Sequence, residues 1–507
     1  MDFRPLDDSL EATDLASLIK CPSITLPLRA LLIVLAHGDH DGKNKEIKHM
    51  QNKHPASDRR KLSPHKIASY AGFATGAILL ICVLVLLFFP NPFLNKIIKP
   101  RITGALAKAY PAYSLSLGDI KYNVFKNLLE IDSVAMIKAD GSQLSNMGLF
   151  SVSGIGWMHL LWRGKPAAND FANAVVDAQN VVLNFPQSQY IFQCERLHAS
   201  VPDSEIVARF VKFQPSGDDE QLFAGSKFRR TRYRLNISDA RVIGVECLDM
   251  IKGKSYSARS AQIQDAFLDI LVNKDKPFDY TNTISAMPHR ILASMKEILR
   301  VDSLSVMNGQ LKYGERYAVG AEPALITIDS IQVQAKGIAN HGNPGAAIVI
   351  RARGNFAKAG TMNVLMTIPV ESREYSFKYS GSLSGMDLRA FNSFLEISEQ
   401  IRIKAGALQS ASFEINVDSG CASGNLRAIY SDLAVAAINK ETGSKKGISD
   451  RTATIIAKIL KIRGTNVPDK SGLMKIGKVN FTLKPDEAFF EYAWFALRSG
   501  IQDIVGF

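Results

Sequence analysis

The sequence predicts a mainly β fold with a few helices (α+β), in which an N-terminal transmembrane helix is followed by a long curved antiparallel sheet that forms a groove. Residues 67–89 form an apolar stretch without a charged residue. From Tyr113 onward, short runs alternate apolar and polar residues between Gly, Asp, Asn and Pro. Strands that alternate with regular helices, as in a dinucleotide-binding fold, are not seen. With 46% hydrophobic and 21% charged residues, the chain is neither disordered nor a multi-span membrane protein.

The first element is the apolar stretch 67–89. About 20 apolar residues in a helix span a hydrocarbon core of roughly 30 Å, and this stretch lacks the polar face of a soluble helix. Pro90 and Pro92 end it. A cleaved signal peptide is the alternative. We expect an uncleaved signal anchor, because the run is longer than an ordinary signal sequence and no clear Ala-x-Ala site follows.

Basic residues flank this span almost equally. They are Lys53, Arg59, Arg60, Lys61 and Lys66 before it, and Lys96, Lys99, Arg101 and Lys108 after it. A long C-terminal domain translocates largely regardless of its own charge. We therefore predict a single-pass membrane protein, with a disordered cytoplasmic leader over residues 1–66 and a large domain outside the cytoplasm. Met50 opens a conventional signal anchor, which makes it a candidate for the true start.

Residues 94–110 predict a short basic amphipathic helix, interrupted near Pro100. It either lies along the membrane surface or forms the first helix of the next domain. In the first case, Lys96, Lys99 and Arg101 would contact anionic lipid headgroups.

The outer domain is predicted as a first β-rich part over 94–300, a second over 301–484 and a C-terminal amphipathic helix over 485–507. In its clearest strands one face is apolar and the other polar, which is the pattern of an antiparallel sheet with one covered face. The residues that we expect to line the groove are Ile331, Val333, Phe413, Ile415, Val479 and Phe481.

Helical spacing of apolar residues predicts further helices over 287–299, 386–401 and 450–462. The C-terminal helix, from Pro485, either caps the end of the sheet or binds a partner or the membrane. A weak internal echo relates 235–245 to 301–312, with 176–183 as a looser copy. We interpret it as repeated strand–turn–strand units rather than a strict repeat.

The run Lys227–Arg234 (KFRRTRYR) mixes five bases with two aromatic residues. An extracytoplasmic location argues against nucleic acid as its partner. One interpretation is a basic strand edge that resists self-pairing. The other is a contact with anionic lipid through Lys227, Arg229 and Arg230. The formal net charge of +13, most of it after residue 66, is compatible with anionic partners and equally with a solvated surface.

Four pieces of the sequence, in order, resemble the AsmA-like envelope proteins, including those of domain of unknown function 748, which are related to TamB-type proteins. The pieces are 102–109 (ITGALAKA) with 113–120 (YSLSLGDI), 134–141 (VAMIKADG), 301–313 (VDSLSVMNGQLKY) with 322–331 (EPALITIDSI), and 422–433 (ASGNLRAIYSDL) with 489–494 (FFEYAW) and 500–501. Each is a degenerate strand pattern, and the likeness spans residues 67–507.

The resemblance implies an inner-membrane anchor, a long curved antiparallel sheet in the periplasm and a groove linked to phospholipid traffic or outer-membrane integrity. It brings no catalytic residues. The chain is short for a bridge across the periplasm, which puts full-length lipid transfer in question. The expected partners are membrane lipids. The alternatives left open are an apolar face that packs on its own helices and binds nothing, and a scaffold for an envelope protein complex.

Signals for chemistry are weak, so we expect no enzyme, no cofactor and no metal. The sequence has no nucleophile elbow, no HExxH, no phosphate-binding loop and no GxGxxG. The cluster 37–41 (HGDHD) suits a metal by residue type, but a solvated loop is the simpler interpretation. A hydrolase with a non-standard site is a further alternative. Five scattered cysteines form neither a disulfide framework nor a zinc site.

Overall fold

The computed structural model describes residues 90–156, 168–279, 295–342, 345–370, 375–438, 461–484, 487 and 489–506. The predicted leader and the predicted span 67–89 lie outside these residues. Among the described helices, none is long and apolar enough to cross a membrane. The described chain is mainly β, as predicted. It divides into two units, which meet between Ala178 and Gln179.

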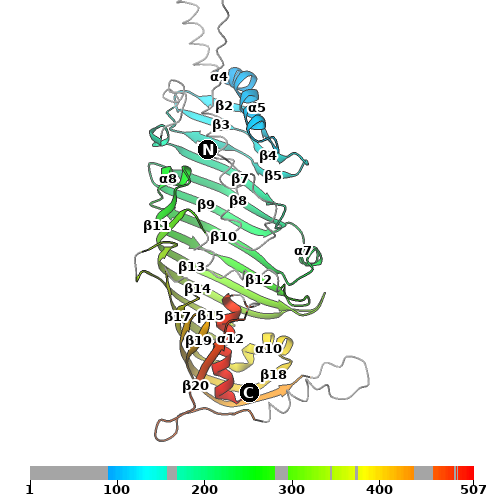
Figure 1. Ribbon diagram of the computed structural model, residues 1–507, viewed down its shortest axis with the longest axis vertical. Helices are drawn as coiled ribbons and strands as arrows, with labels where there is room; N and C mark the ends of the chain where they lie inside the picture. The colour runs from blue at the N-terminus through cyan, green and yellow to red at the C-terminus, as the bar shows by residue number, and fades with distance from the viewer. Residues whose placement is uncertain are drawn as a thin grey trace, which may run out of the picture. The chain divides into compact units, whose positions relative to one another are not determined.

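The first unit combines a helical segment with short antiparallel strands (Figure 1). Its elements are α4 (Pro90–Phe93), η1 (Leu94–Ile98), α5 (Lys99–Ala109), β1 (Tyr113–Leu117), β2 (Ile120–Asn123), β3 (Leu128–Ile131), β4 (Val134–Lys138), β5 (Gln143–Met147), β6 (Phe150–Ser153), η2 (Ala168–Phe171) and the start of β7 (Val175–Phe185). Strand β4 pairs with β1 and β5, while β2, β3, β6 and β7 pair in that order. Ile102 and Leu106 of α5 are buried.

The helical segment is not interrupted at Pro100, contrary to the prediction. Pro100 is the second residue of α5, which directly follows the π-helical turn η1. A proline removes one backbone donor and its ring needs room in the preceding turn. The wider π turn before it accommodates both, so the segment stays helical from Pro90 to Ala109.

The second unit begins at Gln179, within β7, and holds the long strands. Its further elements are β8 (Tyr190–Ser200), β9 (Glu205–Pro215), α7 (Asp219–Ala224), β10 (Thr231–Ile243), α8 (Cys247–Ile251), β11 (Ser255–Gln264), β12 (Phe267–Asn273), β13 (Ile298–Arg316), β14 (Ala324–Ala339), β15 (Ala347–Phe356), β16 (Gly360–Pro369), β17 (Phe377–Asp387), η3 (Leu388–Phe391), α10 (Asn392–Ser398), β18 (Ile401–Asp418), β19 (Cys421–Ala437), β20 (Gly477–Thr482) and α12 (Phe489–Val505).

The pairing of these strands is mixed, not antiparallel throughout as predicted. Neighbours pair antiparallel from β8 to β10 and from β13 to β20. Between these sets, β11 and β12 follow each other end to end. Both run antiparallel to β10 and parallel to β13. Strand β13 therefore begins beside the start of β11, Ile298 opposite Ser255.

The predicted strand–turn–strand repeat is wrong, because its segments lie inside continuous strands. Residues 235–243 belong to β10, and 301–312 lie wholly within β13. In β13 the register shifts around Gly309, next to Asn308, which has φ 55°. In β14 it shifts between Asp329 and Gln332, where Ser330 has φ 51°. A bulge inserts one residue and bends the strand, so the sequence pattern resembles a turn.

The structure confirms some of the predicted helices and corrects others. The C-terminal helix is confirmed as α12, and the helix over 386–401 is confirmed in its middle, as η3 and α10. Its end is corrected, since Gln400 has φ 57° and β18 starts at Ile401. Residues 298 and 299 of the predicted helix 287–299 begin β13 instead, so the boundary proposed at 300/301 falls within a strand. Residues 280–294 and 450–460 lie outside the described residues.

Candidate functional site: the apolar face of the sheet

An unbroken row of apolar side chains crosses the sheet from β8 to β15. Cross-strand partners point to the same side of a sheet, so the register of the strands defines the row. Its members, the first row, are Phe192, Phe213, Leu235, Leu268, Leu311, Ile328 and Phe356. Apart from Phe213, which is buried, their side chains are half-buried.

A second row runs further, from β8 to β20. Its members are Ala199, Ile206, Val242, Ala261, Leu304, Ala335, Ile350, Met366, Tyr379, Ile415, Gly424 and Val479. Gly424 stands in this row because a Cβ there would lie 2.1 Å from the Glu414 carbonyl oxygen. The bulges keep the face continuous: in β14 the apolar positions Ile326 and Ile328 are followed by Ile331 and Val333.

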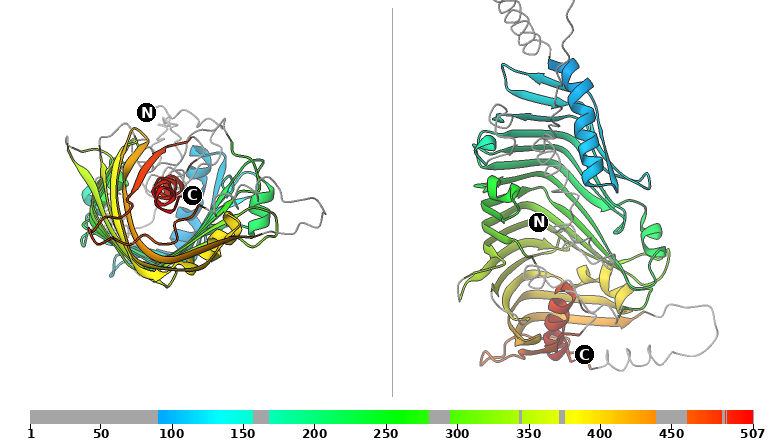
Figure 2. Two further views of the ribbon diagram at one scale, coloured as in Figure 1. Left: turned by 90° about the horizontal axis from the view of Figure 1, so that it is seen from below. Right: turned by 45° about the horizontal axis from the view of Figure 1, so that its top comes forward.

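The two ends of the second row differ in burial. Leu304 and Ile350 are half-buried, whereas Tyr379, Ile415 and Val479 are 5%, 1% and 3% exposed. The difference follows from α12, which lies on the concave side of strands β17–β20 (Figure 2). The face therefore has an open part over β8–β15 and a covered part over β17–β20.

Helix α12 is seated on the covered part by close packing and by hydrogen bonds. Tyr492 is fully buried, and its hydroxyl donates to the Gly420 carbonyl oxygen at 3.0 Å. The Tyr379 hydroxyl donates to the Ala493 carbonyl oxygen at 3.0 Å. At Gly477 of β20, a Cβ would lie 2.1 Å from the backbone oxygen of Gly500. Glycine at this position lets helix and strand approach closely.

A buried charge cluster holds the first turn of α12 against the middle of the sheet. The Lys274 ammonium lies 2.8 Å from Glu315 of β13 and 2.9 Å from Glu491 of α12. Burial by itself would lower the pKa of Lys274, but the two carboxylates outweigh it and raise the pKa above its ordinary value. The Tyr313 hydroxyl donates to Glu315 at 2.9 Å, and the Tyr317 hydroxyl donates to the same carboxylate.

A second cover lies over part of β13–β15. The Phe391 ring of η3 is 5.1 Å from Phe356, and Phe394 of α10 is 6.5 Å from Tyr313. The Ser393 hydroxyl donates to the Leu325 carbonyl oxygen at 3.0 Å. The open part is therefore bounded by these short elements on the side toward α12.

The predicted groove residues divide between the two parts. Ile331 and Val333 of β14 are half-buried on the open part. Ile415 and Val479 are buried in the core under α12. Phe413 and Phe481 pack at the margin of that core, and the Phe481 ring is 5.8 Å from Tyr492. Sequence reasoning missed the members contributed by β8–β13; in β13 a bulge interrupts the alternation.

No family model matches the chain, and no curated protein matches it.

The predicted headgroup contacts fall in two places. Lys96, Lys99 and Arg101 lie on the helical segment of the first unit. Lys227, Arg229 and Arg230 precede β10 in the second unit, where Lys227 and Arg229 are exposed.

Arg230 is tied to the protein itself. Its guanidinium donates to the side-chain oxygen of Gln189 at 2.6 Å and to the Ser188 carbonyl oxygen. Burial lowers its pKa. Among the three bases before β10, Lys227 and Arg229 are therefore the ones whose side chains reach the surface.

The interpretation of the basic run as a strand edge is wrong. Strand β10 is interior, paired with β9 on one side and with β11 and β12 on the other. Two arginines of the run, Arg232 and Arg234, instead pair with acids that α7 and β12 bring over the polar face. Arg232 lies 3.0 Å from Asp269, and Arg234 lies 2.7 Å from Asp219.

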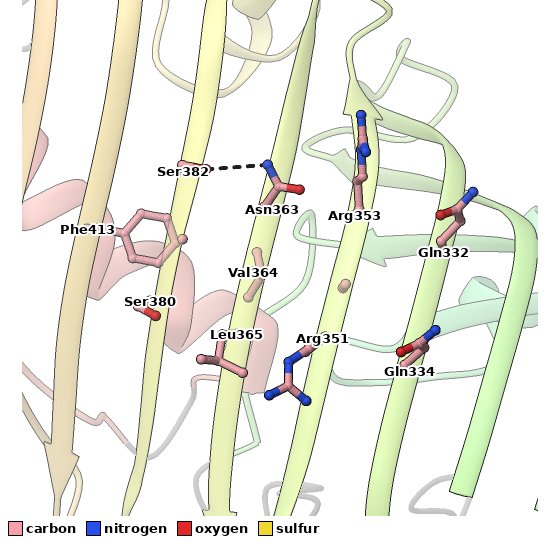
Figure 3. Close-up of a pocket in the computed structure, with 12 residues that line it drawn as sticks. Gln332, Gln334, Arg351, Arg353, Asn363, Val364, Leu365, Ser380, Ser382 and Phe413 are labelled. Atoms are coloured by element: carbon pink, nitrogen blue, oxygen red, sulfur yellow. Dashed lines mark hydrogen bonds between the residues drawn. The ribbon is translucent and has the colours of Figure 1, made fainter.

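The polar face of β14–β18 carries an open depression of about 540 Å³ (Figure 3). Its polar side chains come from alternate positions of neighbouring strands. They are Gln332, Gln334, Arg351, Arg353, Asn363, Ser380 and Ser382. The side chains of Val333 and Gln334 thus lie on opposite faces of β14. The two positions therefore form a matched pair for an experiment.

The described residues offer little for metal or redox chemistry. Among them, no group of three or more His, Cys, Asp or Glu side chains is arranged to hold a metal ion. Cys194, Cys247 and Cys421 are free thiols, and burial raises the pKa of Cys194 and Cys247. The cluster 37–41 lies outside the described residues.

Proposed function

We propose that the chain is a membrane-anchored periplasmic protein of AsmA-like type, in which the open part of the apolar face holds phospholipid acyl chains and thereby supports envelope integrity. The observation that carries this proposal is the first row, which stays apolar and half-buried from β8 to β14. The predicted span 67–89 would tether the chain to the inner membrane, the source of the lipid.

The dimensions and energetics suit an acyl chain. Neighbouring strands are about 4.8 Å apart, so the steps from β8 to β14 extend roughly 24 Å, enough for an extended acyl chain. Each methylene group that leaves water for the row contributes roughly 0.8 kcal/mol. Soluble proteins rarely leave large contiguous apolar surfaces exposed without a partner. The headgroup would remain in water or near basic side chains.

Photo-crosslinking with a matched control tests the proposal. Benzoylphenylalanine is placed at Val333, on the apolar face, or at the adjacent Gln334, on the polar face, in the full chain expressed in bacterial membranes. We expect phospholipid adducts, seen as mass shifts of the protein, at position 333 and none at position 334. Equal labelling at both positions, or none at position 333, would contradict lipid binding by this face.

Substitution provides a second readout. Val333→Asp introduces a charge into the row, whereas Gln334→Asp adds the same charge to the opposite face. We expect the first variant to lose most of the phospholipid that co-purifies with the wild-type chain in native mass spectrometry, and the second to retain it. Urea unfolding of both variants separates loss of lipid from loss of fold.

The covered part favours a second candidate, a scaffold for an envelope protein complex without lipid binding. There the apolar face packs on α12, and its aromatic residues contact one another rather than a ligand. If the same self-packing accounts for the entire face, crosslinks from position 333 will capture protein or nothing, and crosslinks from the polar face will capture a protein partner.

A further inference from the structure

The exposed apolar residues of the first unit lie close to the predicted membrane span. Among the described residues 90–156 and 168–178, the large apolar side chains that are exposed are Phe93, Ile97 and Phe125, at 39%, 41% and 84%. Phe93 and Ile97 are one helical turn apart, directly after the predicted span that ends at residue 89. Phe125 lies in the turn between β2 and β3.

Hydrogen bonds place that turn beside the start of the helical segment (Figure 1). The Asn91 side-chain oxygen accepts from the Tyr122 backbone N–H at 3.0 Å. Asn95 exchanges two bonds with Ile120, accepting from its N–H at 2.9 Å and donating to its carbonyl oxygen at 2.8 Å. Strand β2 is thereby docked along the first turns of the segment, and Tyr122, which is bonded to Asn91, lies three residues before Phe125.

The turn itself is fixed rather than loose. The Asn123 side chain accepts from the Lys126 N–H at 3.0 Å, and the Tyr122 hydroxyl donates to Asn127 at 2.9 Å. Asn127 adopts φ 48°, and its amide donates to the Ile155 carbonyl oxygen at 2.9 Å. Phe125, 84% exposed, is therefore held in a defined turn.

The chemistry around the turn suits a lipid surface. Exposed Lys126 lies next to Phe125, and exposed Lys96 lies between Phe93 and Ile97. Apolar side chains with adjacent bases are the arrangement by which proteins contact the bilayer interface: the apolar groups enter the acyl boundary and the ammonium groups remain at anionic headgroups.

We propose that the β2–β3 turn inserts Phe125 into the interface of the membrane that holds the predicted span, next to the Phe93–Ile97 stripe. This inference rests on the proposed membrane anchor. A second contact beside the span would restrict rotation of the first unit relative to the bilayer. Because the contact needs anionic headgroups near Lys96 and Lys126, it should weaken in neutral lipid.

The test uses the full chain in nanodiscs that contain phosphatidylglycerol. Phe125→Trp introduces an indole at the tip, and Val319→Trp, at the 72%-exposed turn between β13 and β14, is the matched control. Subtracting the wild-type emission isolates the introduced indole. We expect lipids brominated near the headgroup to quench the indole at position 125 by more than half, and aqueous iodide to quench mainly the indole at position 319.

The outcomes separate this inference from the anchor on which it rests. If the full chain floats with vesicles and resists carbonate extraction, yet iodide quenches both indoles equally and bromolipid quenches neither, the turn contact is wrong and the anchor stands. If the chain does not float, both proposals fail. A further variant replaces Phe125 by Ser and carries a fluorescent probe elsewhere on the turn. If the contact exists, iodide should quench this probe more strongly in the Phe125→Ser variant than in the wild-type chain. Circular dichroism and hydrogen exchange like those of wild type would show that the variant keeps its fold.

Discussion

The open and covered parts of the apolar face are built from the same alternation, yet they meet different surroundings. Over β17–β20 the second row ends under α12, with Ile415 1% exposed. Over β8–β15 the same row leaves Leu304 and Ile350 half-buried. The comparison shows that one-sided strands specify an apolar face, while a separate element decides whether that face is core or surface.

The covered part differs from the open part in the residues that allow a helix to pack on it. Gly477 and Gly500 allow β20 and α12 to approach, and Tyr379 and Tyr492 provide hydroxyls that satisfy backbone carbonyls there. Such buried hydroxyls are tolerated because each has a partner. The aromatic rings of this core also contact one another, as between Tyr375 and Tyr492 at 5.2 Å.

The largest effect on this comparison is expected from Lys274→Met. It leaves the buried Glu315 and Glu491 carboxylates without their cation, at a cost of about 3–5 kcal/mol. We expect α12 to detach, which hydrogen–deuterium exchange would report as faster exchange in α12 and β20. Glu491→Gln should cost less, because Lys274 keeps Glu315. Unchanged exchange in the Lys274 variant would show that the cluster does not hold the helix.

Two isoleucines of the second row give a matched pair of intermediate effect. Ile415→Ala removes a buried side chain and should lower the free energy of unfolding by about 2–5 kcal/mol. Ile350→Ala should cost about half as much or less, because part of its surface already contacts water. Urea unfolding of the two full-length variants measures both. Equal losses would mean that the open part is as well packed as the covered part.

The smallest effect is expected from Asp503, at the last turn of α12. It accepts from the Lys475 ammonium and the Lys478 backbone N–H, both at 2.8 Å. These bonds lower the pKa of Asp503 below 3.8, and the bond with Lys475 has the largest effect. A lowered pKa means that the contribution is complete above the ordinary pKa and is lost as the pH falls through the lowered value.

Because Asp503 is partly exposed, we expect this contribution to be about 1 kcal/mol or less. Asp503→Asn should weaken protection of α12 at neutral pH, and the difference from wild type should shrink and vanish as the pH falls from the ordinary carboxyl range through the lowered pKa. Hydrogen exchange across that range is the measurement. A difference that persists at the acid end would assign the effect to packing rather than to charge.

Much of the fold follows from local patterns in the sequence. The alternation at Ile331 and Val333 predicts a strand with an apolar face, and the apolar spacing around Tyr492 predicts the final helix; both are confirmed. The bulges defeated this reasoning. A polar pair such as Asn308–Gly309 has the composition of a hairpin turn, and local propensity does not distinguish a turn from an inserted residue in a continuous ladder.

The candidate site was predictable only in part, for the same reason. Val333 and Ile415 both belong to alternating strands, and nothing in their neighbourhood in the sequence states which one lies under a helix. That depends on a contact between segments far apart in the chain, such as Lys274 with Glu491, 217 residues later. Contacts between residues so far apart in the chain leave no periodic pattern in the sequence.

The sequence by itself determined that the strands after Tyr113 have one apolar and one wettable side, because side-chain direction alternates along every strand regardless of its partners. Only the tertiary structure decided which stretches of that apolar side α12 covers, where bulges carry the rows across the sheet, and that β13 runs parallel to β11 and β12. Those outcomes depend on long-range packing and register, which no local pattern encodes.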